Sequence, residues 1–174
     1  MTDASDTPAR VSATPDKPVA YLLAGLTGSG KTTFAKNLEV SGVTRLSVDE
    51  EVFARHGRHG IDYPEHEYPA RERPVVEHVR HRLAELIRAG HDVVLDYGLW
   101  THSERDDHKR LVERAGGRWR LLYFPVDRHE LLRRLTERSH RDDANALTVT
   151  THMLDEFTAR FQPPSNEGEE IIQS

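Results

Sequence analysis

The stretch Gly25-Leu26-Thr27-Gly28-Ser29-Gly30-Lys31-Thr32 decides how this chain folds, because it fits the pattern G-x-x-x-x-G-K-[ST] without a gap. Glycines at these positions let backbone N–H groups turn inward around phosphate oxygens. In such a loop Lys31 supplies a positive charge to the β and γ phosphates, and the hydroxyl of Thr32 is placed for Mg²⁺. A chance match is expected in roughly one chain of this length in a few hundred. The stretch therefore indicates a loop that binds the phosphates of a nucleotide.

The residues on either side of the loop supply the context that this motif requires. Val19 to Ala24 form a continuous apolar run, which is typical of a strand buried on both faces. Residues 33–40 carry Phe34 and Leu38 one helical turn apart, which indicates a helix whose positive end points at the bound anion. The order of strand, glycine-rich loop and helix favours a phosphate-binding loop over an incidental glycine-rich turn. The candidate ATP-binding residues of the loop are Gly25, Thr27, Gly28, Ser29, Gly30, Lys31, Thr32 and Thr33.

Strands and helices are predicted to alternate along the rest of the chain. Strands are expected over 44–48, 92–96 and 118–124 with a short edge strand over 170–172, and helices over 50–56, 71–89, 101–115, 127–137 and 150–161. Residues 57–69 are rich in Gly, His, Pro and Tyr without a period, and we expect a loop there. This alternation predicts an α/β fold of three layers with a mainly parallel sheet.

The length of 174 residues is that of one domain. Residues 1–18 contain three prolines among small polar residues, and we expect a disordered leader there. Residues 19–174 are predicted to form the domain itself. Within it, the polar residues 138–148 lack apolar anchors and are predicted to form a small mobile lid.

The composition excludes several classes of protein. No run approaches the 18 apolar residues that a membrane span needs, and no apolar signal-peptide core is present, so we expect a cytoplasmic protein. The chain has no cysteine, which excludes disulfides, cysteine-ligated zinc and a cysteine nucleophile. The net charge of −5 disfavours duplex DNA as the main partner.

Four features taken together resemble the small P-loop kinases: the first strand, the phosphate loop, a short strand ending in Val48-Asp49, and a later strand ending in Leu95-Asp96. More narrowly they resemble the zeta-toxin, chloramphenicol phosphotransferase and polynucleotide-kinase group, over roughly residues 19–172. The resemblance implies an AAA-type ATP-binding protein with the P-loop NTPase fold. It implies a kinase that uses ATP and Mg²⁺ to phosphorylate an alcohol group of a small-molecule acceptor.

Two aspartates are the principal candidates for chemistry beyond the loop. The resemblance implies that Asp49 is the catalytic base, and that Asp96 contacts the acceptor or a metal-bound water. Both follow predicted strands, and ligands of parallel sheets bind at the carboxyl ends of strands. A positioned carboxylate can accept the proton of an attacking hydroxyl. The alternatives are that Asp49 only caps the next helix and that Asp96 is only a turn residue.

Arginines near the predicted lid form a second group of candidates. Arg134, Arg138 and Arg141 are spaced by four and three residues, which places them on one face of a helix. Guanidinium groups can clamp the γ phosphate as charge develops in the transition state. We therefore assign ATP binding to all three and catalysis, with Lys31 and Asp49, to Arg134 and Arg138. The alternative is a solvated basic face.

The acceptor is the least determined part of the interpretation. Trp100 is expected either to line the acceptor site or to lie in the core. Arg105, within the Glu104-Arg105 pair that the resemblance also contains, is expected to bind acceptor or to form an ion pair on a helix surface. Asp96 is followed by Tyr97-Gly98-Leu99-Trp100, where polynucleotide kinases tend to have a short polar sequence. The alternatives to a small-molecule kinase are a nucleic-acid end kinase or nucleotide kinase, and a regulatory or toxin-like module that binds or hydrolyses ATP.

Overall fold

The computed structural model describes residues 16–138 and 150–173. The predicted leader, 1–18, and the predicted lid, 138–148, therefore fall almost entirely outside the described residues, and so does Arg141. The described chain begins with the first strand and includes both helices that flank the predicted lid.

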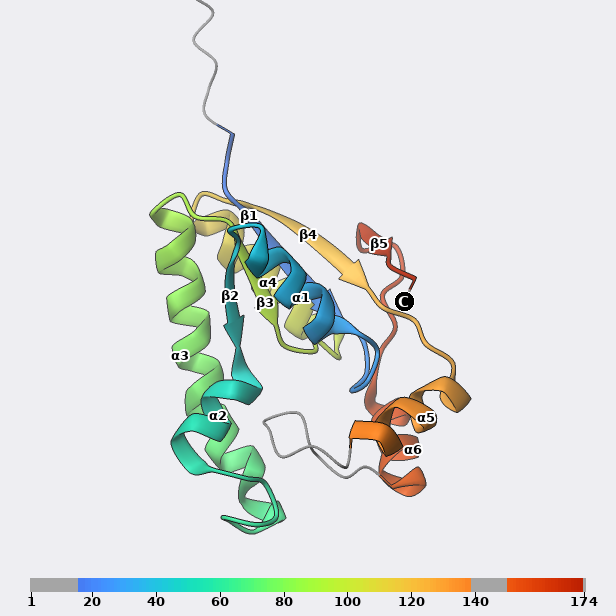
Figure 1. Cartoon of the computed structure of the whole chain (residues 1–174). Coiled ribbons are helices and arrows are strands. Elements are labelled where there is room, and N and C mark those ends of the chain that lie inside the picture. Colours follow the sequence, from blue (N-terminus) through green and yellow to red (C-terminus); the bar gives the residue numbers. More distant parts are fainter. Residues whose placement is uncertain (1–15, 139–149, 174) are drawn as a thin grey trace, which may run out of the picture.

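A five-stranded parallel sheet forms the centre of the molecule (Figure 1). Its strands are β1 (Val19–Ala24), β2 (Thr44–Ser47), β3 (Val93–Asp96), β4 (Arg118–Tyr123) and β5 (Glu169–Ile171). Their order in the sheet is β2-β3-β1-β4-β5, and every neighbouring pair is parallel. The predicted α/β fold is confirmed, and the predicted edge strand is one residue out of step with β5.

Six α-helices and one short 3-10 helix connect and follow the described strands. They are α1 (Lys31–Val40), α2 (Val48–His56), α3 (Tyr68–Arg88), α4 (His102–Arg114), α5 (Arg128–Arg138), α6 (Thr151–Arg160) and the 3-10 helix Glu65–Glu67. Helix α3 begins three residues before the predicted start, because Pro69 occupies its first turn, where a missing N–H costs nothing. Thr101 and Glu104 form a capping box at the start of α4, where the sequence predicted a helix. Within the described part of the chain, no helix is both long enough and apolar enough to cross a membrane.

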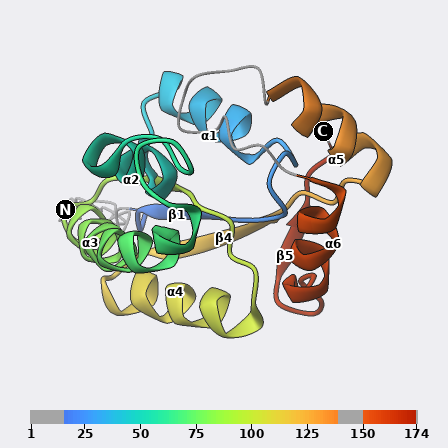
Figure 2. The same cartoon turned by 90° about the horizontal axis from the view of Figure 1, so that it is seen from below.

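The helices cover both faces of the sheet and produce three layers (Figure 2). On one face, α3 and α4 bury Leu83 and Val112 against Leu22 of β1 and its neighbours in β3 and β4. On the other face, α1 packs Ala35 against Leu23. Alternate residues of the central strand β1 therefore face opposite layers, which explains why this segment reads as a continuous apolar run.

The strand order determines where a ligand site can form. Strand β3 lies between β2 and β1, so β1 and β3 are neighbours in the sheet. The chain leaves β1 toward β2 on one side and leaves β3 toward β4 on the other side, so the two connections run in opposite directions. This is the kind of position where ligands bind in open α/β sheets, outside the carboxyl ends of the strands. Helices α2 and α3 flank this edge on one side and α5 and α6 on the other (Figure 1).

Candidate functional site

The predicted phosphate loop lies between β1 and α1, with backbone conformations that require glycine. Gly28 and Gly30 have φ angles of 86° and 101°, in the left-handed region that other residues rarely adopt. Gly30 is the N-cap residue of α1, so the loop runs directly into the positive end of that helix. The Ser29 N–H donates to the Leu26 carbonyl at 3.1 Å, which closes the turn. These features let the loop surround an anion with backbone N–H groups.

The Lys31 ammonium lies over the loop that precedes it. Its Nζ donates to the Gly25 and Leu26 carbonyls, both at 2.8 Å, and to Ser29 Oγ at 3.3 Å. Removal from bulk water lowers the pKa of Lys31 to about 8, against the opposing effects of the Asp96 and Asp49 charges. The lysine is therefore held at the loop, within electrostatic reach of both predicted aspartates.

Asp96 is buried at the end of β3, where its two carboxylate oxygens have different partners. Oδ1 accepts a hydrogen bond from Thr32 Oγ1 at 3.1 Å, so the aspartate and the last residue of the loop motif are in contact. Oδ2 accepts from Nε and Nη2 of Arg45 at 3.1 and 2.9 Å. Arg45 also binds Glu50 through both terminal nitrogens. The charge of Asp96 is thus balanced by Arg45, which orients the other oxygen toward Thr32.

Asp49 lies in the first turn of α2 but does not cap it. The cap is Ser47, whose Oγ accepts from the Glu50 N–H at 3.2 Å, so helix capping does not explain the presence of Asp49. The Asp49 side chain opens to solvent and accepts a hydrogen bond from the Tyr68 hydroxyl at 3.1 Å. The surrounding protein nonetheless displaces enough water to raise the pKa of Asp49 to about 6, and the nearby negative charges of Glu72 and Asp96 add to this shift.

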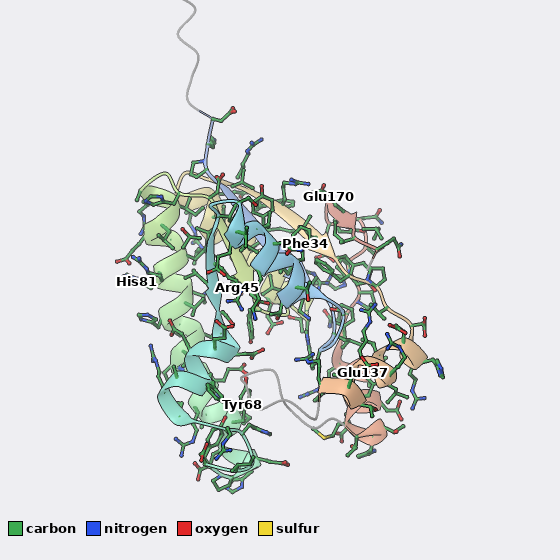
Figure 3. All side chains as sticks on the ribbon, in the orientation of Figure 1. Phe34, Arg45, Tyr68, His81, Glu137 and Glu170 are labelled. Atoms are coloured by element: carbon green, nitrogen blue, oxygen red, sulfur yellow. The ribbon has the colours of Figure 1, made fainter. Side chains whose placement is uncertain are left out.

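Helix α3 and the segment after β3 bring three further polar groups to Asp49. Tyr68 begins α3, and Glu72 lies one helical turn later on the same face. The hydroxyl of Tyr97 donates to Glu72 Oε1 at 3.0 Å. Figure 3 shows Tyr68 beyond the carboxyl end of β2, where α2 and α3 lie side by side. Burial beside these carboxylates raises the pKa of both tyrosines, so they stay protonated and donate hydrogen bonds.

Helix α5 approaches the phosphate loop from the opposite side. Arg134 Nη1 donates to the Gly28 carbonyl at 3.3 Å, while its Nε donates to Glu130 at 2.8 Å. The charge of Arg138 acts on Lys31 and contributes to lowering its pKa. Leu131 and Leu135 of α5 pack in one cluster with Leu26 of the loop. The structure therefore brings two of the three predicted arginines to the loop.

Arg105 differs from both interpretations of its sequence position. It is fully buried, and its guanidinium binds both carboxylate oxygens of Glu167 at 2.9 and 3.0 Å. It also donates to the carbonyls of Leu99 and Gln162. The side chain joins α4 to the C-terminal segment and does not lie on a helix surface or open to an acceptor. The burial of this guanidinium therefore argues against a contact between Arg105 and an acceptor.

Trp100 lies between the phosphate loop and α6. Its ring is half-buried, with its centroid 5.3 Å from that of Phe157 and with the Arg160 guanidinium 5.3 Å above it. Its Nε1 lies close to Gly98, which in turn lies close to the phosphate loop. A Cβ added at Gly98 would be 3.1 Å from this nitrogen and 3.1 Å from the carbonyl oxygen of Gly25. This position adjoins the loop, and Trp100 as a wall of the acceptor site stays a prediction.

Oxygen atoms that suit Mg²⁺ lie together at the loop. In the described residues no three His, Asp or Glu side chains gather in a group that could hold a metal by themselves. Mg²⁺ in nucleotide sites is usually held by one or two protein oxygens together with phosphates and water. The adjacent oxygens of Thr32 and Asp96 fit that pattern.

Arg45, Tyr68, Glu72 and Tyr97 were not identified from the sequence. Tyr68 fell in the segment predicted as an aperiodic loop, and Glu72 resembled any other polar residue of a surface helix. Only the spacing of Tyr68 and Glu72, one helical turn apart, could have linked them. Arg45 shows no local signal, since its main partner Asp96 is 51 residues away.

Comparison with known proteins gives a family and a fold. The model of an AAA domain family matches residues 21–164. No curated protein matches the chain by sequence. A protein of Chloroflexus aurantiacus J-10-fl with a provisional kinase assignment superposes with a TM-score of 0.70 at 15% identity, over 92% of this chain and 86% of that one.

Two further solved structures superpose on most of this chain. The APS kinase CysC of Mycobacterium tuberculosis, in complex with AMPPNP and APS, has a TM-score of 0.61 at 18% identity, over 91% of this chain and 90% of its own. A chain of the Pnkp1/Rnl/Hen1 RNA repair complex has a TM-score of 0.62 at 18% identity, over 91% of this chain and 51% of its own. At such identities the likeness establishes the fold alone.

Proposed function

The chain belongs to the AAA domain family, and on that premise we propose that it is a kinase that transfers the γ-phosphate of ATP to a hydroxyl group of a small-molecule acceptor. The observation that carries the proposal is the position of Asp49, which follows β2 at the same edge of the sheet as the phosphate loop and lies close enough to Lys31 for each charge to affect the pKa of the other. A bare phosphate-binding loop needs no second carboxylate, whereas transfer to an alcohol benefits from a base there. Within the family, Val48-Asp49 and Leu95-Asp96 support placement in the zeta-toxin and chloramphenicol phosphotransferase group.

The nucleotide end of the site is assigned to the loop and α5. Backbone N–H groups from Gly25 to Thr33 cradle the phosphates, and Lys31 meets the β and γ phosphates. Arg134 and Arg138, with Arg141, balance the charge that develops on the transferred group. Thr32 and Asp96 would hold Mg²⁺, which would neutralise phosphate charge.

The acceptor end is assigned to Asp49. Its carboxylate accepts the proton of the acceptor hydroxyl as that oxygen forms a bond to the γ phosphorus, and the bond from this phosphorus to the bridging oxygen breaks to release ADP. A pKa of about 6 leaves Asp49 mostly ionised at neutral pH and therefore able to act as a base. Asp96 and Trp100 are the further residues that we assign to acceptor binding. Negative charge on Asp49 and Glu72 disfavours a polyphosphate strand, which supports a small acceptor over a nucleic-acid end.

An assay of ATP consumption with a panel of sugars, antibiotics, nucleosides and oligonucleotides tests this proposal. We expect ADP formation to rise with one class of small alcohol, and Lys31→Ala to abolish it. Consumption that no acceptor increases would instead indicate a hydrolase or regulatory module, and a rise only with oligonucleotides would indicate a nucleic-acid end kinase.

Asp49→Asn separates catalysis from binding. It should lower acceptor-dependent turnover by about 10²- to 10⁴-fold and leave ATP affinity nearly unchanged, because the amide cannot take the proton. The defect of Asp96→Asn should vary with Mg²⁺ concentration, and that of Asp49→Asn should not. Glu51→Gln, on the same helix but paired with Arg55, serves as the matched control. Turnover at the parent rate in Asp49→Asn would show that Asp49 is not the base.

A further inference from the structure

Glu72 lies beside the acceptor end of the site, but its carboxylate has no role in the proposed transfer of the phosphate. The side chain is partly buried, and its Oε1 accepts a hydrogen bond from the Tyr97 hydroxyl at 3.0 Å. Among the described residues it forms no ion pair with a lysine or arginine, unlike Asp96, which is bound by Arg45. The preceding residue, Arg71, binds Glu67 and stacks on Tyr63. Glu72 therefore presents a carboxylate at the acceptor end that no lysine or arginine of the described residues binds.

Tyr68 connects the position of Glu72 to that of Asp49. Its hydroxyl donates to Asp49 Oδ1 at 3.1 Å, and Glu72 follows one helical turn later on the same face of α3. Side chains four residues apart on a helix are neighbours, with Cβ atoms about 5–6 Å apart. An acceptor whose hydroxyl reaches Asp49 can therefore place a group a few carbons away beside Glu72.

We propose that Glu72 is a specificity-determining residue that selects an acceptor with an ammonium group on a carbon near the reacting hydroxyl, as in an amino alcohol or amino sugar. The inference rests on the proposed function, because the phosphate loop and Asp49 define where the hydroxyl reacts. Asp49 receives the hydroxyl proton, and Glu72 binds the ammonium group through a charge-assisted hydrogen bond. The same negative charge repels an acceptor that carries a carboxylate or phosphate at this position.

Matched acceptors that differ in charge at a single carbon test this inference. Two sets suffice: 6-amino-6-deoxyglucose, glucose and glucuronate, which differ at carbon 6, and 3-amino-1,2-propanediol, glycerol and glycerate, which differ at one terminal carbon. A hydrogen bond to a charged group corresponds to about a 10- to 100-fold preference. We therefore expect kcat/KM for the amine to exceed kcat/KM for the neutral analogue by this factor, and kcat/KM for the acid to be the lowest of the three.

Variants of Glu72 separate charge recognition from a structural role. Glu72→Gln should raise KM for the amine at least tenfold, with little change in kcat and little change for the neutral acceptor. Glu72→Asp should restore part of the preference, and Glu72→Lys should favour the acid. Glu77→Gln, exposed on the same helix, is the matched control. A structural role alone would lower turnover of all three acceptors together and would overturn the inference.

The failure of this inference is distinguishable from failure of the kinase proposal. If neutral or acidic acceptors are phosphorylated as fast as the amine, Glu72 does not select an ammonium group, whereas the kinase function still holds. The absence of acceptor-dependent ADP formation with every member of both sets and with the broader panel would contradict both.

Discussion

Replacing Arg45 with methionine should leave a buried negative charge beside the phosphate loop without its partner. The side chains of Arg45 and Asp96 are 6% and 5% exposed, and the substitution removes both hydrogen bonds from Arg45 to Asp96 Oδ2. Breaking a buried pair by removing one partner costs about 3–5 kcal/mol, because the remaining charge is desolvated and uncompensated. Loss of the contact with Glu50, which is 43% exposed, adds only about 0–1 kcal/mol.

Thermal or urea denaturation measures this effect. For a domain of this size a loss of 3–5 kcal/mol corresponds to a fall in Tm of roughly 10 °C. Arg55→Met, which removes an exposed i,i+4 pair with Glu51, is the control and should change stability by no more than about 0.5 kcal/mol. Arg45→Met/Asp96→Asn should recover part of the loss, because the second change removes the stranded charge. If Arg45→Met is no less stable than Arg55→Met, the argument that Arg45 balances Asp96 is refuted.

The raised pKa of Asp49 leads to two further predictions, and the burial of Arg105 leads to a third. With the pKa of Asp49 raised to about 6, acceptor turnover should fall as the pH drops through 6, with about one tenth of the base ionised at pH 5; a flat rate profile from pH 5 to 7 would contradict the base assignment. The folded protein holds the Asp49 proton more tightly than the unfolded chain, so ionisation destabilises the fold, and Asp49→Asn should stabilise it above pH 6 but not below pH 4 in denaturation experiments. Arg105→Met should cost about 3–5 kcal/mol by leaving Glu167 unpaired, and Arg105→Met/Glu167→Leu should restore much of it; no recovery in the double variant would show that the pair is not the source of the loss.

Much of the fold was predictable because its signals are local. The glycines at positions 28 and 30 adopt the positive φ angles that the loop motif requires, and the run Val19–Ala24 forms a central strand with both faces covered. Helix ends followed short capping patterns such as Thr101 with Glu104. The largest error was at the start of α3, where Tyr68 and Pro69 were assigned to a loop.

The sequence by itself determined the phosphate loop, the alternation of strands and helices, and the candidate aspartates at strand ends, because each depends on residues within a turn or two of one another. Tertiary structure alone decided which side chains meet. The strand order brings Arg45 of β2 to Asp96 of β3, and the packing of α3 on α2 brings Tyr68 to Asp49. Burial of Arg105 likewise depends on Glu167, 62 residues away. Such pairings leave no local periodicity, because the partners are far apart in the sequence and meet only after the sheet and its helices have packed.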